Sequence, residues 1–164
     1  MPDLLELCAA AVDAAEGGEH VEAFGEERST TSVEAHRGEI EGLTFAESRG
    51  VGVRVISDGR LGFAHAADPS VDEVREAVSR ARENVAVASP DPFNALPAAE
   101  PIEELDGLFS ETLASMSTDE KVPIALGMER AATTMDPRVR KTESVRYGDA
   151  VGAAAIASTE GVRV

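Results

Sequence analysis

The chain has 164 residues, and 31 acidic against 15 basic side chains give it a formal net charge of −16 at pH 7. Nucleic-acid binding draws most of its affinity from cations placed on phosphates, so this charge argues against a direct DNA or RNA partner. A hydrophobic fraction of 43% permits a packed core, and an aromatic fraction of 4% with no tryptophan makes that core aliphatic. The length fits one domain, or one domain and part of a second.

Lysine is scarce, since Lys121 and Lys141 are the only lysines among the 15 basic residues. An acidic surface with few lysines indicates a salt-rich cytoplasm, where charge repulsion is screened because the Debye length falls to ~3 Å near 1 M salt. An acidic protein from an ordinary cytoplasm is the alternative interpretation. The first interpretation predicts a melting temperature that rises with KCl concentration.

The single cysteine, Cys8, allows no disulfide within the chain, and we expect it to be a small apolar residue on a helix. The first arginine is Arg28, so the amino terminus lacks the basic region of a signal peptide. The longest strongly apolar stretch, residues 150–157, is too short to cross a bilayer. We therefore expect a soluble, cytoplasmic protein with no membrane partner.

The first half of the chain changes from a helical to a strand-like period. Apolar residues at helical spacing predict a helix over residues 3–16, and Gly17-Gly18 is expected to end it. Strict alternation then predicts five short strands, at 20–28, 31–37, 40–48, 51–57 and 60–66. The expected turns are Arg37-Gly38, Arg49-Gly50 and Asp58-Gly59. Short strands joined by tight turns predict an antiparallel meander.

Two further helices are predicted from capping-box spacing. Ser70 and Glu73 begin a helix whose aliphatic stripe runs from Val71 to Val85, and we expect this stripe to cover one face of the meander. Ser117 and Glu120 repeat the spacing before a helix over residues 118–135. Strand-like runs at 140–148 and 151–159 follow.

The segment 89–116 contains four prolines, which exclude a long helix or a central strand. Its apolar residues, such as Phe93, Leu105 and Phe109, suggest that parts of this extended crossing pack down. We therefore expect an α+β protein with a domain at 1–88, a crossing segment at 89–116 and the truncated start of a second α+β domain at 117–164. The first domain should hold a meander of about five strands packed against two helices.

No catalytic, cofactor-binding or metal-ligating residue is predicted. Metal sites need several converging ligands, but the sequence has no H-E-x-x-H spacing and no cysteine cluster. His20, His36 and His65 lie in three different predicted strands, and a solvated strand surface explains the pair His20 and Glu22. We expect His65 to be partly buried and His36 to be exposed beside Glu34.

Other motif searches also favour structural interpretations. Gly50-Val51-Gly52 lacks the third glycine of a dinucleotide-binding loop and leads into a strand. The alternating carboxylates Glu39, Glu41 and Glu47 fit a solvated sheet face better than paired acid-base chemistry. The serines show no nucleophile-elbow pattern.

One stretch resembles a known family. The segments R-G-E-I-E at 37–41, S-R-G-V-G-V-R-V at 48–55 and D-G-R-L-G-F-A at 58–64 resemble the amino-terminal domain of the TldD/PmbA metallopeptidases, also called modulators of DNA gyrase. S-P-D-P-F-N-A-L-P at 89–97 resembles the linker of the PmbA (TldE) branch, and residues 134–149 resemble the start of the middle domain. Together these segments cover most of the chain.

The resemblance implies a role without a transferable catalytic residue. Active relatives carry zinc on an H-E-x-x-x-H motif and a further cysteine in their carboxy-terminal half, a motif that this sequence lacks. It implies a scaffold and substrate-channel portion of a metallopeptidase, or of its non-catalytic PmbA-like partner, acting in cytoplasmic proteolysis. The implied partners are a TldD/PmbA-type subunit or a second copy of the chain, and an unfolded peptide substrate.

Two alternatives stay open. The chain could be a stand-alone, non-catalytic interaction module, or a modulator of DNA gyrase that acts through protein contacts, since the charge argues against DNA contact. If the meander lines a peptide channel, one of its edge strands could bind extended substrate by backbone pairing. The sequence does not indicate which edge.

Overall fold

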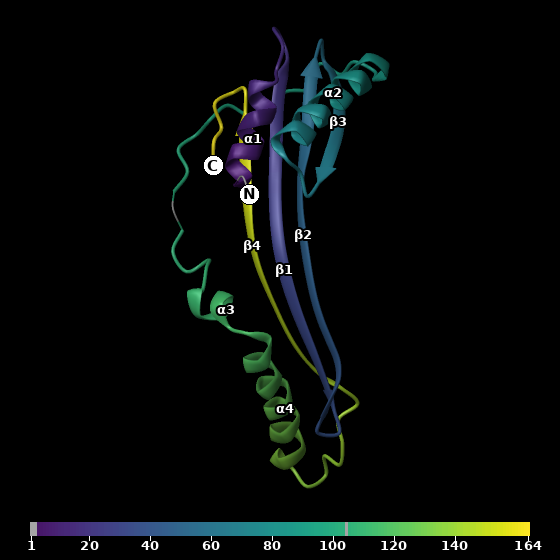
Figure 1. The fold of residues 1–164 in the computed structure, drawn as a ribbon, viewed down its shortest axis with the longest axis vertical. Helices are drawn as coiled ribbons and strands as arrows, with labels where there is room; N and C mark the ends of the chain where they lie inside the picture. Colours follow the sequence, from purple (N-terminus) through teal and green to yellow (C-terminus); the bar gives the residue numbers. More distant parts are fainter. Residues whose placement is uncertain (1–2, 104) are drawn as a thin grey trace. The chain divides into compact units, whose positions relative to one another are not determined.

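The computed structural model describes residues 3–103 and 105–164. The elements follow in the order α1 (Leu4–Asp13), β1 (His20–His36), β2 (Glu39–Ser57), β3 (Arg60–Ala67), α2 (Val71–Val87), α3 (Glu111–Ser115), α4 (Thr118–Met135) and β4 (Val145–Ser158) (Figure 1). The strands form one antiparallel sheet of four strands in the order β3-β2-β1-β4. The predicted α+β class with an antiparallel sheet is confirmed.

The chain divides into two compact units, neither of which is continuous in sequence. Unit 1 comprises Met1–Arg28, Ser48–Glu103 and Gly152–Val164, and unit 2 comprises Ser29–Glu47 and Glu104–Val151. Residue 104, which belongs to the predicted crossing segment, lies outside the described residues. The predicted domain boundaries at residues 88 and 116 stay a prediction.

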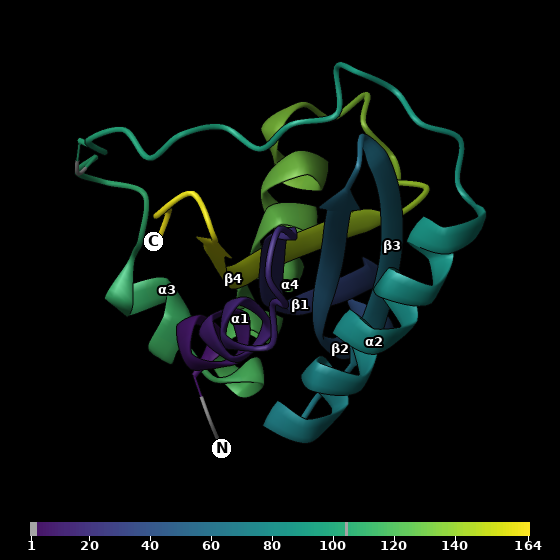
Figure 2. The ribbon, with the colours of Figure 1, turned by 90° about the horizontal axis from the view of Figure 1, so that it is seen from above.

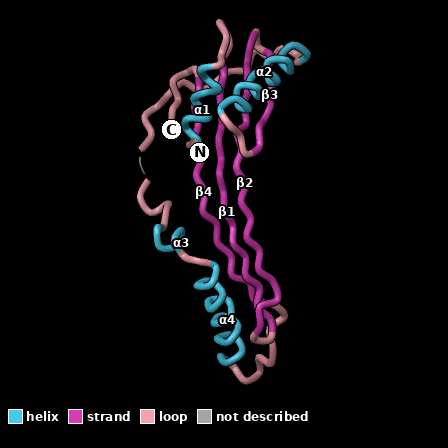
Figure 3. The backbone as a smooth tube through the Cα atoms, in the orientation of Figure 1, coloured by secondary structure: helices cyan, strands magenta, loops and turns pink. Residues whose placement is uncertain are grey.

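The strands are fewer and longer than predicted. The runs at 20–28 and 31–37 form one strand, β1, and the runs at 40–48 and 51–57 form β2, which is continuous in Figure 3. The turns at Arg37-Gly38 and Asp58-Gly59 are confirmed, because both residues of each pair have positive φ. The predicted turn at Arg49-Gly50 is wrong, since Gly50 pairs with Ala67 inside the β2–β3 ladder. The last strand-like runs likewise merge, into β4, which joins the sheet beside β1.

Unit 1 has an aliphatic core between the sheet and two helices. Figures 1 and 2 both place α2 alongside β3, while α1 contributes Leu7 and the buried Cys8. Alternate residues of β2 face this core and are completely buried, including Val53 and Val55. Burying one such side chain stabilises the fold by ~1.5–3 kcal/mol. The close approach of β3 to α2 depends on Gly62, because a Cβ there would lie 1.9 Å from the carbonyl oxygen of Ala81.

Unit 2 has a much smaller core, centred on Val33 and Ala35 of β1 and Ala125 of α4. A buried ion pair supplements it: Lys121 Nζ lies 3.0 Å from Asp149 Oδ1, and it also donates to Thr31 Oγ1. Both charged side chains are less than one-tenth exposed. Buried polar contacts therefore contribute a larger share of the stabilising interactions in unit 2 than in unit 1.

The predicted helices are confirmed with small changes. The helix α4 has the bounds that were predicted, and α2 begins with the predicted capping box between Ser70 and Glu73. The helix α1 ends at Asp13, before the predicted Glu16, and begins with a further capping box between Asp3 and Glu6. Among the described helices, none combines the length and apolar character needed to span a membrane.

The start of the crossing segment is fixed by polar contacts. The carbonyl oxygen of Gly59, in the β2–β3 turn, accepts from Asp91 N–H and from Asn94 Nδ2, both at 2.8 Å. The prediction that parts of this segment pack down is wrong for Phe93, Leu105, Leu108 and Phe109, which are exposed, Phe93 to 90%. Leu96 of the same segment is half-buried.

Candidate functional site

A stretch of β2 in unit 2, Glu39–Glu47, lies at an edge of the sheet. The strand β3 pairs with β2 only from Gly50 to Ser57, so among the described residues this stretch has a neighbouring strand on its β1 side alone. Two large apolar residues on it are exposed, Leu43 at 49% and Phe45 at 55%. We call Glu39–Glu47 the open edge.

The direction of the backbone groups along the open edge follows from one hydrogen bond. The carbonyl oxygen of Arg49 accepts from Asp68 N–H at 2.8 Å, so it points away from β1. Backbone groups alternate in direction along a strand, and those of Leu43, Phe45 and Glu47 therefore also point away from β1. Unpaired groups of this kind can form hydrogen bonds with another extended chain.

In unit 1, by contrast, both edges of the sheet are occupied. At β3, the carbonyl oxygens of Phe63 and His65 accept from the side chains of Asn84 and Arg80 of α2, at 2.9 and 3.0 Å. At β4, the amides of Ile156 and Ser158 donate to the tail that follows the strand, within residues 162–164. Such covering is a common way to prevent an edge from pairing with another chain.

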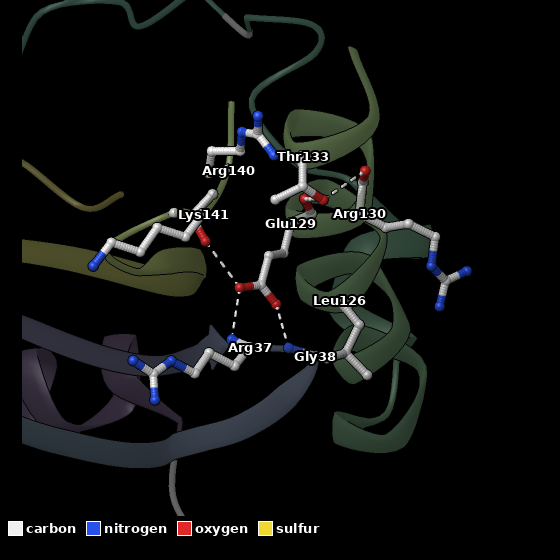
Figure 4. A pocket seen from close by; sticks show the side chains of 9 residues that line it. Arg37, Gly38, Leu126, Glu129, Arg130, Thr133, Arg140 and Lys141 are labelled. Atoms are coloured by element: carbon white, nitrogen blue, oxygen red, sulfur yellow. Dashed lines mark hydrogen bonds between the residues drawn. The ribbon is translucent and has the colours of Figure 1, made fainter. Parts of the chain in front are cut away.

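The turn that precedes the open edge is bound to α4 by a carboxylate. Glu129 accepts hydrogen bonds from Arg37 N–H, Gly38 N–H and Thr142 Oγ1, each at 2.8 Å, and is only 6% exposed (Figure 4). The amides can converge because both turn residues have positive φ, which glycine adopts without strain at position 38. These hydrogen bonds, that from Gly38 above all, lower the pKa of Glu129 below its usual range. Glu129 is therefore a buried anion that fixes the hairpin.

Four cationic residues line a hollow beside this carboxylate. This hollow of about 390 Å³ in unit 2 is also lined by Leu126 and Thr133, and the four residues are Arg37, Arg130, Arg140 and Lys141. Within the described part of the chain none of the four forms an ion pair with an acidic side chain. In Figure 4 the side chains of Arg37 and Lys141 extend to the same side, Arg140 lies beside Thr133, and Arg130 extends away on the other side of α4. The hollow is thus positive in a strongly negative chain.

The histidines that the sequence analysis named do not come together. His20 is exposed and its Nδ1 lies 2.7 Å from Glu160 Oε1. His65 is exposed and stacks on Phe63, so its predicted partial burial is wrong. His36 is half-buried rather than exposed, and its Nδ1 is buried without a hydrogen-bond partner among the described residues.

The described residues do not fit a zinc site. Zinc takes three or four converging ligands, and residues 3–103 and 105–164 contain no group of three histidine, cysteine or acidic side chains that could hold a metal. Burial raises the pKa of the Cys8 thiol to about 11, and this thiol donates to the carbonyl oxygen of Ala155. A thiol in that state is a poor metal ligand.

The sequence analysis missed both Glu129 and the cationic hollow. A single glutamate in a helix carries no signal in a chain with 31 acidic residues. Arg140 and Lys141 follow shortly after the Asp136–Arg138 turn, and adjacent basic residues were the one local hint. That they line one hollow together with Arg37 is a result of the tertiary fold.

Sequence comparisons match two segments of the chain to one family. Residues 21–85 match the family model for PmbA/TldA metallopeptidase domain 1, and residues 111–164 match the PmbA/TldA metallopeptidase central domain. The Metalloprotease PmbA of Escherichia coli O157:H7 is 28% identical over 135 residues, which are 80% of this chain. The chain spans 29% of the length of that relative.

Solved structures show the same fold. TldE from Thermococcus kodakarensis superposes with a TM-score of 0.79 at 17% identity, over 96% of this chain and 35% of that one. A protein described as a modulator of DNA gyrase from Thermotoga maritima MSB8 gives a TM-score of 0.78 at 22% identity, over 96% of this chain and 35% of its own. With two segments that match family models and together cover well over half of its length, the chain belongs to the PmbA/TldD metallopeptidase family.

Proposed function

We propose that this chain is the peptide-binding scaffold portion of a PmbA/TldD-family metallopeptidase, or of its non-catalytic PmbA-like partner, acting in cytoplasmic proteolysis. An extended, unfolded peptide would bind by adding a strand to the open edge. Bond cleavage would depend on zinc held by residues outside this chain. The partner would be a TldD/PmbA-type subunit or a second copy of the chain.

The observation that carries this proposal is the difference between the sheet edges. Side chains of α2 and the tail after β4 occupy the edges in unit 1, whereas β2 pairs with β3 only from Gly50 onward. Backbone pairing needs no particular side chain in the peptide, which suits a peptidase with varied substrates. Leu43 and Phe45 add exposed apolar surface at the same place.

A second candidate function is that of an interaction module without peptide binding. It is favoured by the exposed apolar side chains of the crossing segment, among them Phe93 at 90% and Leu108 at 80%. A partner protein that covered such side chains would remove apolar surface from water. An effect on DNA gyrase through such a protein contact belongs to this candidate.

Peptide binding to the 164-residue chain tests the proposal directly. The probe is a fluorescein-labelled unfolded peptide, and its anisotropy gives the dissociation constant. A copy of the peptide that is N-methylated at every residue has no N–H to donate to the open edge, and we expect it to bind at least about tenfold more weakly. Equal affinity for the two peptides would show that the peptide does not pair with the backbone of the open edge.

A matched pair of variants tests the protein's side of the ladder. Glu47→Pro removes a backbone N–H that points outward, while Glu47→Thr changes the same side chain and keeps the N–H. We expect Glu47→Pro to weaken peptide binding about tenfold and Glu47→Thr to leave it unchanged. Circular dichroism of both variants serves as the folding control.

A further inference from the structure

The cationic hollow lies at one end of the open edge. Arg37 and Gly38 line the hollow and directly precede Glu39, the first residue of the open edge. Of the 15 basic residues in the chain, four are gathered at this one place. A cluster of cations without acidic partners is costly in self-repulsion, so its position next to a free strand edge points to an anionic ligand.

The carboxylate of Glu129 does not neutralise most of that positive charge. Its oxygens already accept from two backbone amides and from the Thr142 hydroxyl, and within residues 3–103 and 105–164 no cation lies within ion-pair distance of either oxygen. The guanidinium of Arg140 and the ammonium of Lys141 are therefore available to a ligand. Arg140 can bind both oxygens of a carboxylate at once, while Lys141 supplies a point charge.

The direction of a bound peptide determines which of its ends reaches the hollow. A peptide that pairs antiparallel with β2 runs from the Glu47 end toward Glu39, so its carboxy terminus arrives beside the Arg37-Gly38 turn. A parallel peptide would bring its positively charged amino terminus to the same cations. Electrostatics thus favour the antiparallel direction and a free carboxy terminus.

We propose that the hollow formed by Arg37, Arg140 and Lys141 binds the carboxy-terminal carboxylate of a peptide paired antiparallel with the open edge. This inference rests on the proposed function. It adds a preference for peptides whose carboxy terminus lies beside the Arg37-Gly38 turn. Internal segments of a folded protein would lack the terminal charge. The hollow therefore favours peptides with a free carboxy terminus at this position.

The test compares one unfolded peptide in two forms, with a free carboxy terminus and with a carboxy-terminal amide. We expect the free acid to bind the wild-type chain about tenfold more tightly than the amide, and NaCl to reduce this ratio. In the double variant Arg140→Gln/Lys141→Gln the ratio should fall to about one while the affinity for the amide stays unchanged. Arg138→Gln is the control, because Arg138 is paired with Asp136 and does not line the hollow.

The outcomes separate the two proposals. If both peptide forms bind equally and N-methylation still weakens binding, the carboxylate site is overturned and the open edge stands. If an amidated peptide with an added terminal glutamate binds as tightly as the free acid, the hollow recognises acidic side chains and the terminal preference is overturned. If neither peptide binds, both proposals fall.

Discussion

The two units of the chain are stabilised in different ways. Unit 1 buries a continuous aliphatic core that includes completely buried residues of α1, α2, β1 and β2. Unit 2 has three fully buried apolar residues at its centre, and around them two buried polar links, Lys121 with Asp149 and Glu129 with the Arg37-Gly38 turn. Apolar burial depends on volume and shape, whereas polar links depend on charge.

The two units also differ in how far the backbone at their sheet edges is exposed. Unit 1 covers its sheet edges with α2 side chains and with residues 162–164, but unit 2 leaves Glu39–Glu47 open. An open edge next to a large apolar core would favour unspecific pairing with other chains. The smaller, more polar unit 2 is therefore better suited to present such an edge for binding.

The largest effect should come from a volume change in unit 1. In Gly62→Ala, the new Cβ would lie 1.9 Å from the carbonyl oxygen of Ala81 and 2.6 Å from the backbone nitrogen of Val85. Because both atoms belong to the backbone of α2, the helix must move, and we expect a loss of about 4 kcal/mol or more. Urea unfolding measures the loss, and hydrogen exchange should show it in α2 and β3.

The matched control for this prediction is Gly127→Ala in α4 of unit 2. A Cβ at Gly127 meets no atom within 4 Å, so the change should stabilise the helix by ~0.5–1 kcal/mol. Unchanged stability in Gly62→Ala would contradict the close packing of β3 against α2.

A smaller effect should come from breaking the buried ion pair of unit 2. Lys121→Met leaves the carboxylate of Asp149 buried without its cation, and we expect a loss of about 3 kcal/mol. The double variant Lys121→Met/Asp149→Leu removes both charges and should recover most of that loss. If the single and double variants lose equal stability, the ion pair is not what holds α4 to the strands.

Local features of the fold could be predicted from the sequence, and long-range ones could not. The turns at Arg37-Gly38 and Asp58-Gly59 and the capping box at Ser70 depend on neighbouring residues, and all three were predicted. The turn at Arg49-Gly50 failed because its conformation is set by pairing with β3. The pairing of β4 with β1 joins residues more than 100 positions apart, for which no local pattern exists.

The candidate site shows the same limit more strongly. Glu129 lies 92 residues from Arg37 in sequence, and neither residue type nor spacing links them before the chain folds. The open edge is visible only once the end of β3 pairing at Gly50 is known. The alternation of Glu39, Glu41 and Glu47 was interpreted as a solvated face, which describes the side chains and leaves the backbone edge unmentioned.

The smallest of these effects is a pH dependence that belongs to unit 2. Hydrogen bonds from Gly38 and Thr142 hold the pKa of Glu129 below its ordinary value of 4.5, because they stabilise the charged carboxylate. A lowered carboxylate pKa contributes stability above pH 4.5, and that contribution is lost as the pH falls through the folded-state pKa. Glu129→Gln should therefore be less stable than the wild type at pH 7 and lose less stability on acidification. Hydrogen exchange in the β1–β2 hairpin and α4, followed from pH 7 to well below pH 4.5, measures this difference. A variant that keeps the wild-type pH profile would show that the acid sensitivity comes from other carboxylates with lowered pKa values, such as Glu120 and Asp136 in unit 2 or Glu19 in unit 1.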